Sequence, residues 1–273
     1  MIAASASRVS GATTGSTLDW IIRTGVAGCF IGHGAFGVIT KAAWVPYFAV
    51  GGISEPWAWR LMPWIGAMDI TIGLLALLRP SRALFAWAVV WTVWTALLRP
   101  LSGEPFWEAL ERAGNYGVPL AALALVGLRG AWFTRLHADA PVPAGAARNR
   151  LAWTLRLTTF TLLAGHAGLG LFAHKALLAR HYTALGVADA AALVPRIGLV
   201  EFFLAGLVLV RPRSGLLFAL CCWKIATETL FLVAGAPVWE LIERFGSYTA
   251  PLALALLLTR PRPVPAAGSV FAT

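Results

Sequence analysis

Two stretches of 18 residues decide the fold: PWIGAMDITIGLLALLRP at 63–80 and PRIGLVEFFLAGLVLVRP at 195–212. Each is an apolar run that ends in Arg-Pro and holds one acidic residue, Asp69 or Glu201, and Glu201 follows Asp69 by 132 positions. About 20 mostly apolar residues suffice for a helix to cross the hydrocarbon core of a bilayer. The two stretches therefore predict membrane-spanning helices within a repeated unit.

The composition of the whole chain indicates the same class of protein. Hydrophobic residues make up 59% of the 273 residues, charged residues make up 12%, and the mean hydropathy is +0.74. These values lie outside the usual range of soluble domains and exclude an ordinary water-soluble enzyme. The formal charge of +10 does not indicate a nucleic-acid partner, because the Lys and Arg residues lie largely between the apolar runs. A positive-inside bias accounts for them.

We expect an all-α, polytopic protein with eight membrane-spanning helices, surrounded by the lipid bilayer. The predicted spans are 18–40, 57–78, 82–98, 106–128, 151–174, 191–210, 214–233 and 238–258. Arginines are concentrated after the second, fourth, sixth and eighth spans. This side and both termini are therefore predicted to be cytoplasmic, with the protein in the inner membrane.

The repeat extends over both halves of the chain. WEALERAGNYGVPL at 107–120 matches WELIERFGSYTAPL at 239–252 with the same offset of 132, and GHGAFG at 32–37 matches GHAGLG at 165–170 with an offset of 133. The predicted organisation is a polar tail at 1–17, a four-helix repeat at 18–128, a cytoplasmic Pro/Ala-rich linker at 129–150, a second repeat at 151–260 and a tail at 261–273. Because four spans return the chain to its starting side, the two four-helix bundles should have parallel orientation.

Ionisable side chains inside the predicted spans are the candidate catalytic residues, because burying a charge in hydrocarbon is costly. They are His33, Asp69, Glu111 and Arg112 in the first repeat and His166, Glu201, Glu243 and Arg244 in the second. A rise of about 1.5 Å per helical residue puts His33, Asp69 and Glu111 at similar depth. The i,i+4 spacing predicts a pair between Glu108 and Arg112 and another between Glu240 and Arg244. The alternative is that these groups only satisfy one another and set the helix register.

Aromatic and amide side chains near these positions are candidates for contact with a bound ligand: Trp91, Asn115, Tyr116 and Tyr248. Trp91 could stack on a flat ligand, and helix packing is the alternative. The two repeats also differ. Thr92, Ala96 and Arg99 of the first align with Lys224, Glu228 and Phe231 of the second. The sequence therefore allows either two sites or one shared asymmetric site.

The repeated unit resembles the DoxX-like membrane family. The resemblance is carried by the Gly-rich first helix, by the acid in IGAMD at 65–69 and IGLVE at 197–201, and by the Pro-Leu pair in the fourth helix. Better-described DoxX-like proteins are membrane subunits associated with quinone-linked sulfur oxidation. The resemblance implies a quinone cofactor, other subunits of a membrane redox complex as partners, and Asp69 and Glu201 in the place of the family's helix-2 acid. His33 and His166 depart from the family pattern.

The favoured hypothesis is a quinone-linked redox subunit in which a histidine and a carboxylate exchange protons. A second hypothesis is a metal or haem protein. His33 and His166 would then ligate haem axially, or the two histidines together with the four carboxylates of Asp69, Glu111, Glu201 and Glu243 would hold a metal pair. A third is an ion or solute transporter that uses the same polar layer, and a fourth is a purely structural subunit. No phosphate-binding loop, nucleophile elbow or HExxH motif is present in the chain.

Overall fold

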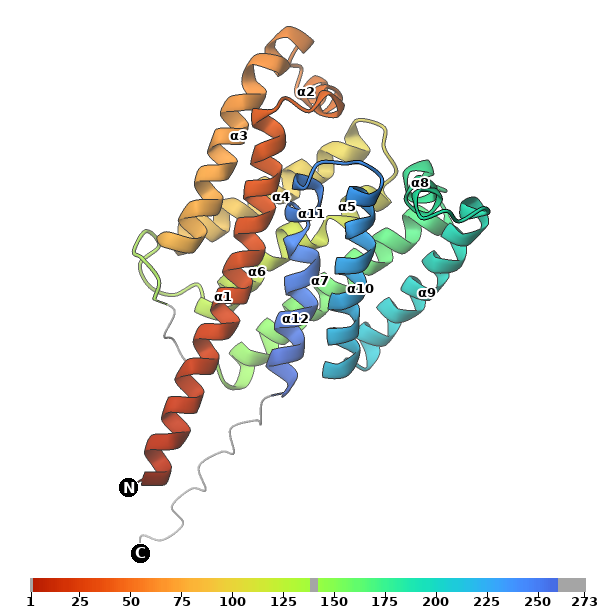
Figure 1. Cartoon of the computed structure of the whole chain (residues 1–273). Coiled ribbons are helices and arrows are strands. Elements are labelled where there is room, and N and C mark those ends of the chain that lie inside the picture. The colour runs from red at the N-terminus through yellow and green to blue at the C-terminus, as the bar shows by residue number, and fades with distance from the viewer. Residues whose placement is uncertain (1, 138–141, 260–273) are drawn as a thin grey trace, which may run out of the picture.

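The computed structural model describes residues 2–137 and 142–259, and within these ranges every regular element is a helix (Figure 1). Six segments are long and apolar enough to cross a membrane: Gly15–Val38, Glu55–Leu78, Arg82–Leu101, Ala190–Val210, Ser214–Val233 and Trp239–Thr259. The prediction of an all-helical, multi-pass membrane protein is confirmed at this level.

The described residues before the linker, here called the first half, form seven helical elements. These are α1 (Ile2–Val38), the short 3-10 helix η1 (Ala42–Trp44), α2 (Val45–Val50), α3 (Glu55–Leu78), α4 (Arg82–Leu101), α5 (Trp107–Glu111) and α6 (Ala113–Val126). The second half forms α7 (Gly145–Leu171), α8 (Ala176–Ala184), α9 (Ala190–Val210), α10 (Ser214–Val233), α11 (Trp239–Ile242) and α12 (Phe245–Thr259). The short helices α2, α5, α8 and α11 lie in the upper half of the view in Figure 1.

The predicted span 106–128 is not one continuous helix. Helix α5 ends at Glu111, α6 begins at Ala113, and α6 by itself has only 14 residues. Arg112 between them has a ψ of 8°, outside the helical range. The equivalent segment in the second half is also divided, into α11 and α12.

The predicted span 151–174 corresponds to α7, which begins earlier, at Gly145, and ends at Leu171. The chain then bends by 88° into α8. His174 in this bend has a φ of +46°, which cannot continue a right-handed helix. If α7 and α8 count as one bent span, the candidate crossings number seven. The predicted number of eight stays a prediction.

Glycines allow the first two long helices of each half to pack at close range. A Cβ atom on Gly34 of α1 would lie 2.6 Å from the carbonyl oxygen of Gly66 in α3. In the second half, a Cβ atom on Gly198 of α9 would lie 2.9 Å from the carbonyl oxygen of Ala167 in α7. Small residues at such crossings are a general feature of helix packing in membranes. They hold α1 against α3, and α7 against α9.

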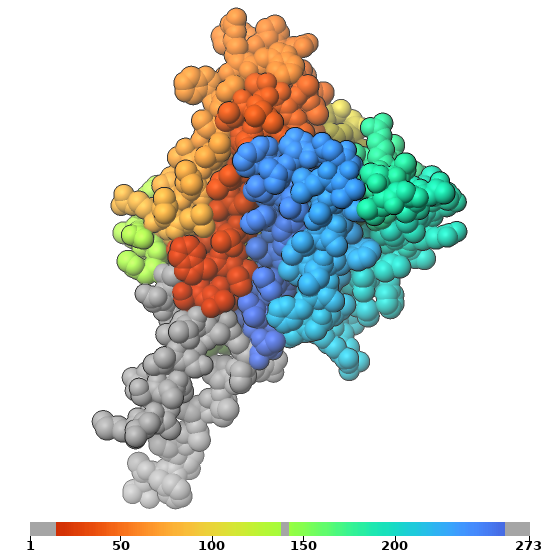
Figure 2. Space-filling view, viewed as in Figure 1, coloured from red at the N-terminus to blue at the C-terminus, as the bar shows by residue number. Residues whose placement is uncertain are grey.

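The first helix of each half also packs against the last helices of the other half. Helix α1 contacts α11 and α12, and α7 contacts α5 and α6. Figure 2 shows α1 (red) beside the blue surface formed by residues of the last helices. Along α1, the side chains of Leu18, Ile22, Val26 and Phe30 recur every fourth residue and are buried. The two halves therefore share a single core rather than forming separate bundles.

The outer helices present apolar side chains to their surroundings. Trp64 of α3 is 76% exposed, Val90 of α4 is 62% exposed and Phe203 of α9 is 66% exposed. Such surfaces are unfavourable in water but are the natural exterior of a protein in lipid. They support the assignment to a membrane and direct attention to the polar groups inside.

Candidate functional site

Each half places a histidine against a buried carboxylate. In the first half, Nδ1 of His33 on α1 lies 2.9 Å from Oδ2 of Asp69 on α3. In the second half, Nδ1 of His166 on α7 lies 2.5 Å from Oε2 of Glu201 on α9. Both acidic residues have no exposed surface. The glycine-mediated packing of α1 on α3 and of α7 on α9 brings each pair together.

The two pairs differ in how their second carboxylate oxygen is satisfied. Oε1 of Glu201 accepts a hydrogen bond of 2.9 Å from Nε1 of Trp223 on α10. Trp91 on α4 is the sequence equivalent of Trp223, but its buried Nε1 has no hydrogen-bond partner in the described structure, and neither has Oδ1 of Asp69. Aspartate is one methylene shorter than glutamate, so its carboxylate extends less far from its own helix. The first half thus retains an unpaired donor and an unpaired acceptor, a costly arrangement in a buried place.

A cavity of about 210 Å³ lies beside the first pair. Four of the predicted site residues line it: His33, Trp91, Arg112 and Asn115. Trp44 also lines it and stacks on the ring of His33, with 4.4 Å between the ring centroids. The wall therefore combines several aromatic rings with cationic and amide groups.

Small side chains on α4 leave room for this cavity. Thr92 and Ala96 line it. Their equivalents in α10 are Lys224 and Glu228, which form a buried ion pair with 2.7 Å between Nζ and Oε1. The sequence difference between the repeats therefore becomes a difference in shape, because the first half is open where the second half holds two long charged side chains.

Arg99 and Tyr47 line the cavity, and both contact Glu104. Nη1 of Arg99 lies 3.2 Å from Oε2 of Glu104, and the Tyr47 hydroxyl donates to the other carboxylate oxygen. Burial raises the pKa of Glu104, but the hydrogen bond from Tyr47 and the charge of Arg99 outweigh this effect, so the pKa lies below its usual value. Glu104 therefore keeps its negative charge and holds α2 against the end of α4.

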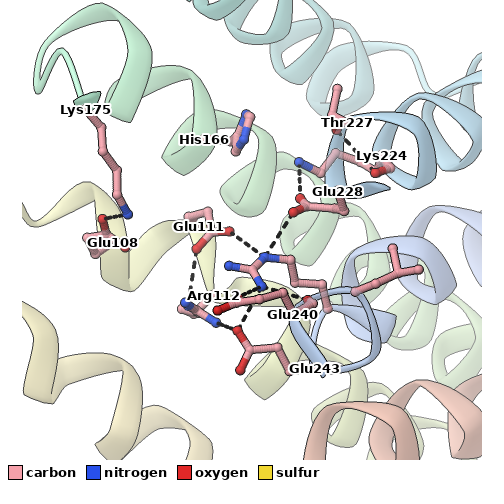
Figure 3. A network of polar contacts seen from close by, with 12 residues as sticks. Glu108, Glu111, Arg112, His166, Lys175, Lys224, Thr227, Glu228, Glu240 and Glu243 are labelled. Carbon is pink, nitrogen blue, oxygen red and sulfur yellow. Dashed lines mark hydrogen bonds and ion pairs between the residues drawn. The ribbon is translucent and has the colours of Figure 1, made fainter. Parts of the chain in front are cut away.

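An ion-pair cluster that includes the cavity residue Arg112 joins the two halves (Figure 3). Nη1 of Arg112 lies 2.9 Å from Oε1 of Glu243, which also lies 2.8 Å from Nη1 of Arg244. Nε of Arg112 lies 3.2 Å from Oε2 of Glu111, and Nε of Arg244 lies 3.8 Å from Oε1 of Glu111. The predicted residues Glu111, Arg112, Glu243 and Arg244 thus meet across the interface.

The cluster continues through residues beyond the predicted set. Arg244 also pairs with Glu228 at 2.9 Å and with Glu240 at 2.6 Å, and Nζ of Lys41 lies 2.6 Å from Oε1 of Glu240. With Lys224 included, the connected pairs comprise four carboxylates and four cations, namely Glu111, Glu228, Glu240 and Glu243 with Lys41, Arg112, Lys224 and Arg244. Charge balance of this kind is what makes a buried cluster tolerable.

One of the two predicted i,i+4 pairs is formed and the other is not. Arg244 pairs with Glu240 as expected. Glu108 instead pairs with Lys175, which follows α7, and with Arg99 at 3.6 Å. The prediction for Glu108 and Arg112 was wrong because each has other partners: Lys175 and Arg99 for Glu108, and Glu111 and Glu243 for Arg112. Lys41 and Lys175 were missed, although both follow the GHGAFG and GHAGLG helices at nearly the same offset.

Tyr116 and Tyr248 do not line the cavity. The Tyr116 hydroxyl donates to the carbonyl oxygen of Ala109 at 3.3 Å, and the Tyr248 hydroxyl donates to that of Leu241 at 3.1 Å. Each therefore tethers the short helix before the break to the long helix after it. The role as ligand contacts that we expected for these tyrosines stays a prediction, and Tyr116 lines a second hollow, between α6 and α7.

No group of three or more His, Cys, Asp or Glu side chains in the described part of the chain is arranged to hold a metal ion. The predicted carboxylates instead pair with histidines or arginines. The metal-pair hypothesis is therefore not supported.

Comparison of the chain with protein-family models, curated proteins and solved structures finds no match.

Proposed function

We propose that this protein is a membrane quinone-binding subunit whose single quinone site is the cavity beside His33 and Asp69. The observation that carries the proposal is that Trp91, whose buried Nε1 has no hydrogen-bond partner among the described residues, lines the same cavity as His33. An unpaired, buried indole N–H is stabilised when a ligand oxygen accepts its hydrogen bond. A quinone head group offers such oxygens on a flat ring.

The residues around the cavity fit a quinone head group. A volume of about 210 Å³ suits a single substituted ring rather than a larger cofactor. Trp44 and Trp91 provide aromatic faces against which a ring can pack. Arg112 and Asn115 provide further donors for a second ring oxygen on the same wall.

The His33 and Asp69 pair is suited to proton transfer. An ionised Asp69 accepts the Nδ1 proton of His33, which leaves Nε2 as the nitrogen that can exchange a proton with a group in the cavity. A quinone takes up two protons as it accepts two electrons, which another subunit of a redox complex would supply. In this proposal the imidazolium form of His33 gives one proton from Nε2 and becomes a neutral imidazole, and the second proton, like the two electrons, comes from outside the pair of His33 and Asp69.

We further propose that the fold is a duplicated DoxX-like unit with eight crossings, in which α5 and α6 together form the fourth. The matching sequence repeats and the equivalent contacts of His33 with Asp69 and of His166 with Glu201 support this proposal. The arginine-rich loops support an inner-membrane location with cytoplasmic termini. The second half would then be a stabilising copy, because Trp223 already satisfies Glu201.

Equilibrium dialysis of the purified full-length protein against ubiquinone-1 tests the proposed site. We expect saturable binding to the wild type and about tenfold weaker binding to Trp91→Phe, which keeps an aromatic ring but loses the N–H donor. Trp223→Phe is the matched control, because its indole N–H is already bonded to Glu201. It should bind ubiquinone-1 as the wild type does.

Two results would overturn the proposal. One is the absence of saturable ubiquinone-1 binding to a folded wild-type protein. The other is equal weakening by Trp91→Phe and Trp223→Phe, which would mean that the substitutions act through stability. The thermal unfolding midpoint of each variant distinguishes a lost ligand contact from a loss of stability. We expect the midpoint to decrease more for Trp223→Phe than for Trp91→Phe, because Glu201 loses its hydrogen-bond donor.

A further inference from the structure

A second hollow runs between α6 and α7, away from the quinone cavity. It has a volume of about 960 Å³ and is lined by small and apolar side chains of both helices, among them Gly117, Leu120 and Ala124 of α6 and Leu157, Thr158 and Thr161 of α7. Leu120 is 45% exposed and Leu157 is 48% exposed. The hollow is therefore a groove open to the surroundings of the protein, here called the α6/α7 groove.

Two arginines lie at one end of the α6/α7 groove. Arg129 follows α6, Arg150 lies near the start of α7, and both line the groove and are exposed. No acidic side chain in the described ranges forms an ion pair with either guanidinium. Trp153 lies on the same stretch of α7 and also lines the groove. The groove thus has an aromatic and cationic end and an apolar remainder.

The length of the groove matches one leaflet of a bilayer. Its α6 wall extends from Ala113 to Val126, which at a rise of about 1.5 Å per residue corresponds to about 20 Å. Half of a hydrocarbon core of about 30 Å is about 15 Å. An acyl chain lying in the groove would therefore bring its head group to the level of the arginines.

We propose that the α6/α7 groove binds one anionic glycerophospholipid, with its phosphate between Arg129 and Arg150 and an acyl chain along Leu120, Ala124 and Leu157. Arginine suits this role because its planar guanidinium can donate two hydrogen bonds to one phosphate. The lipid would pack between the two halves of the protein, because α6 belongs to the first half and α7 to the second. This site is independent of the proposed quinone function.

Native mass spectrometry of the full-length, delipidated protein tests the proposal. The protein is titrated in detergent with dioleoyl phosphatidylglycerol or dioleoyl phosphatidylcholine. We expect the first bound phosphatidylglycerol to be held about 30-fold more tightly than phosphatidylcholine, from the attraction of two arginines to the anionic head group. The variant Arg129→Gln/Arg150→Gln should abolish this preference.

The matched control is Arg211→Gln/Arg213→Gln, which removes two exposed arginines from the loop between α9 and α10. It should retain the preference for phosphatidylglycerol. Ala124→Trp, which fills the groove, should weaken binding of both lipids. Equal affinity of the wild type for the two lipids, equal effects of the two arginine pairs, or undiminished lipid binding to Ala124→Trp would each overturn the proposal.

Discussion

Arg112 is the residue on which the cavity and the interface both depend. It lines the cavity, and it pairs with Glu111 of its own half and with Glu243 of the other half. Glu111 and Glu243 are themselves buried, with exposed fractions of 9% and 2%, so bulk water is a poor substitute partner for them. Removing one member of a buried ion pair is far more destabilising than the net contribution of the intact pair, because a charge is left without compensation.

Arg112→Gln should therefore lower the free energy of unfolding by about 3 to 5 kcal/mol. Adding Glu243→Gln restores the balance of charges in the cluster, so the double variant should be more stable than Arg112→Gln alone. Chemical denaturation of the purified protein in detergent, followed by circular dichroism, gives both values. A double variant whose loss equals the sum of the two single losses would show that the charges are not coupled.

At several helix crossings in this protein, a side chain larger than that of glycine would collide with the neighbouring helix. At the crossing of α6 and α12, a Cβ atom on Gly114 would lie 2.7 Å from both the carbonyl carbon of Gly246 and the amide nitrogen of Ser247. The crossing lies directly beside Arg112 and Arg244 in the sequence. Close backbone approach at this point lets the two arginines reach carboxylates of the opposite half.

Gly114→Ala should force the two helices apart and lower the free energy of unfolding by about 1 to 3 kcal/mol, the usual effect of overpacking. Gly206→Ala in α9 is the control, because a Cβ atom there would meet nothing within 4 Å. That substitution should be neutral or stabilise the helix by up to about 1 kcal/mol. The thermal unfolding midpoints of the two variants test this prediction. An equal decrease in both midpoints would contradict a steric effect of the added Cβ atom at the crossing of α6 and α12.

At the scale of the whole molecule, the halves hold each other through packing and charge. Helix α1 packs on α12 and α7 packs on α6. Lys41 of the first half pairs with Glu240 of the second, while Lys175 of the second pairs with Glu108 of the first. These contacts do not depend on the linker that joins the halves.

Residues 1–140 and 141–273, produced as separate chains in the same cell, should therefore assemble. An even number of crossings in each part would let both insert with the same orientation. Affinity purification through a tag on the first part should recover the second in equal amount. The variant Gly114→Leu/Gly246→Leu should reduce this recovery, and independent migration of the unmodified parts in size-exclusion chromatography would refute the shared core.

The apolar runs, the repeat and the ionisable residues inside the helices could be recognised without a structure. The hydropathy pattern is a local property, and it predicted the helical membrane character that the described residues have. His33 and Asp69 were also predicted to lie at one level, because helical rise is regular. The break at Arg112 could not be predicted in this way, since the apolar pattern continues through it and the partners of its charges lie elsewhere in the chain.

The sequence by itself determined that the protein belongs in a membrane, that its two parts repeat one pattern, and which side chains would need partners there. Only the tertiary structure decided which groups those partners are: Lys175 for Glu108, Glu243 for Arg112, and no partner for the Trp91 indole in the described part of the chain. The reason is physical. Hydrophobicity acts residue by residue along a helix, whereas an ion pair or a cavity depends on how helices distant in sequence come to lie against one another.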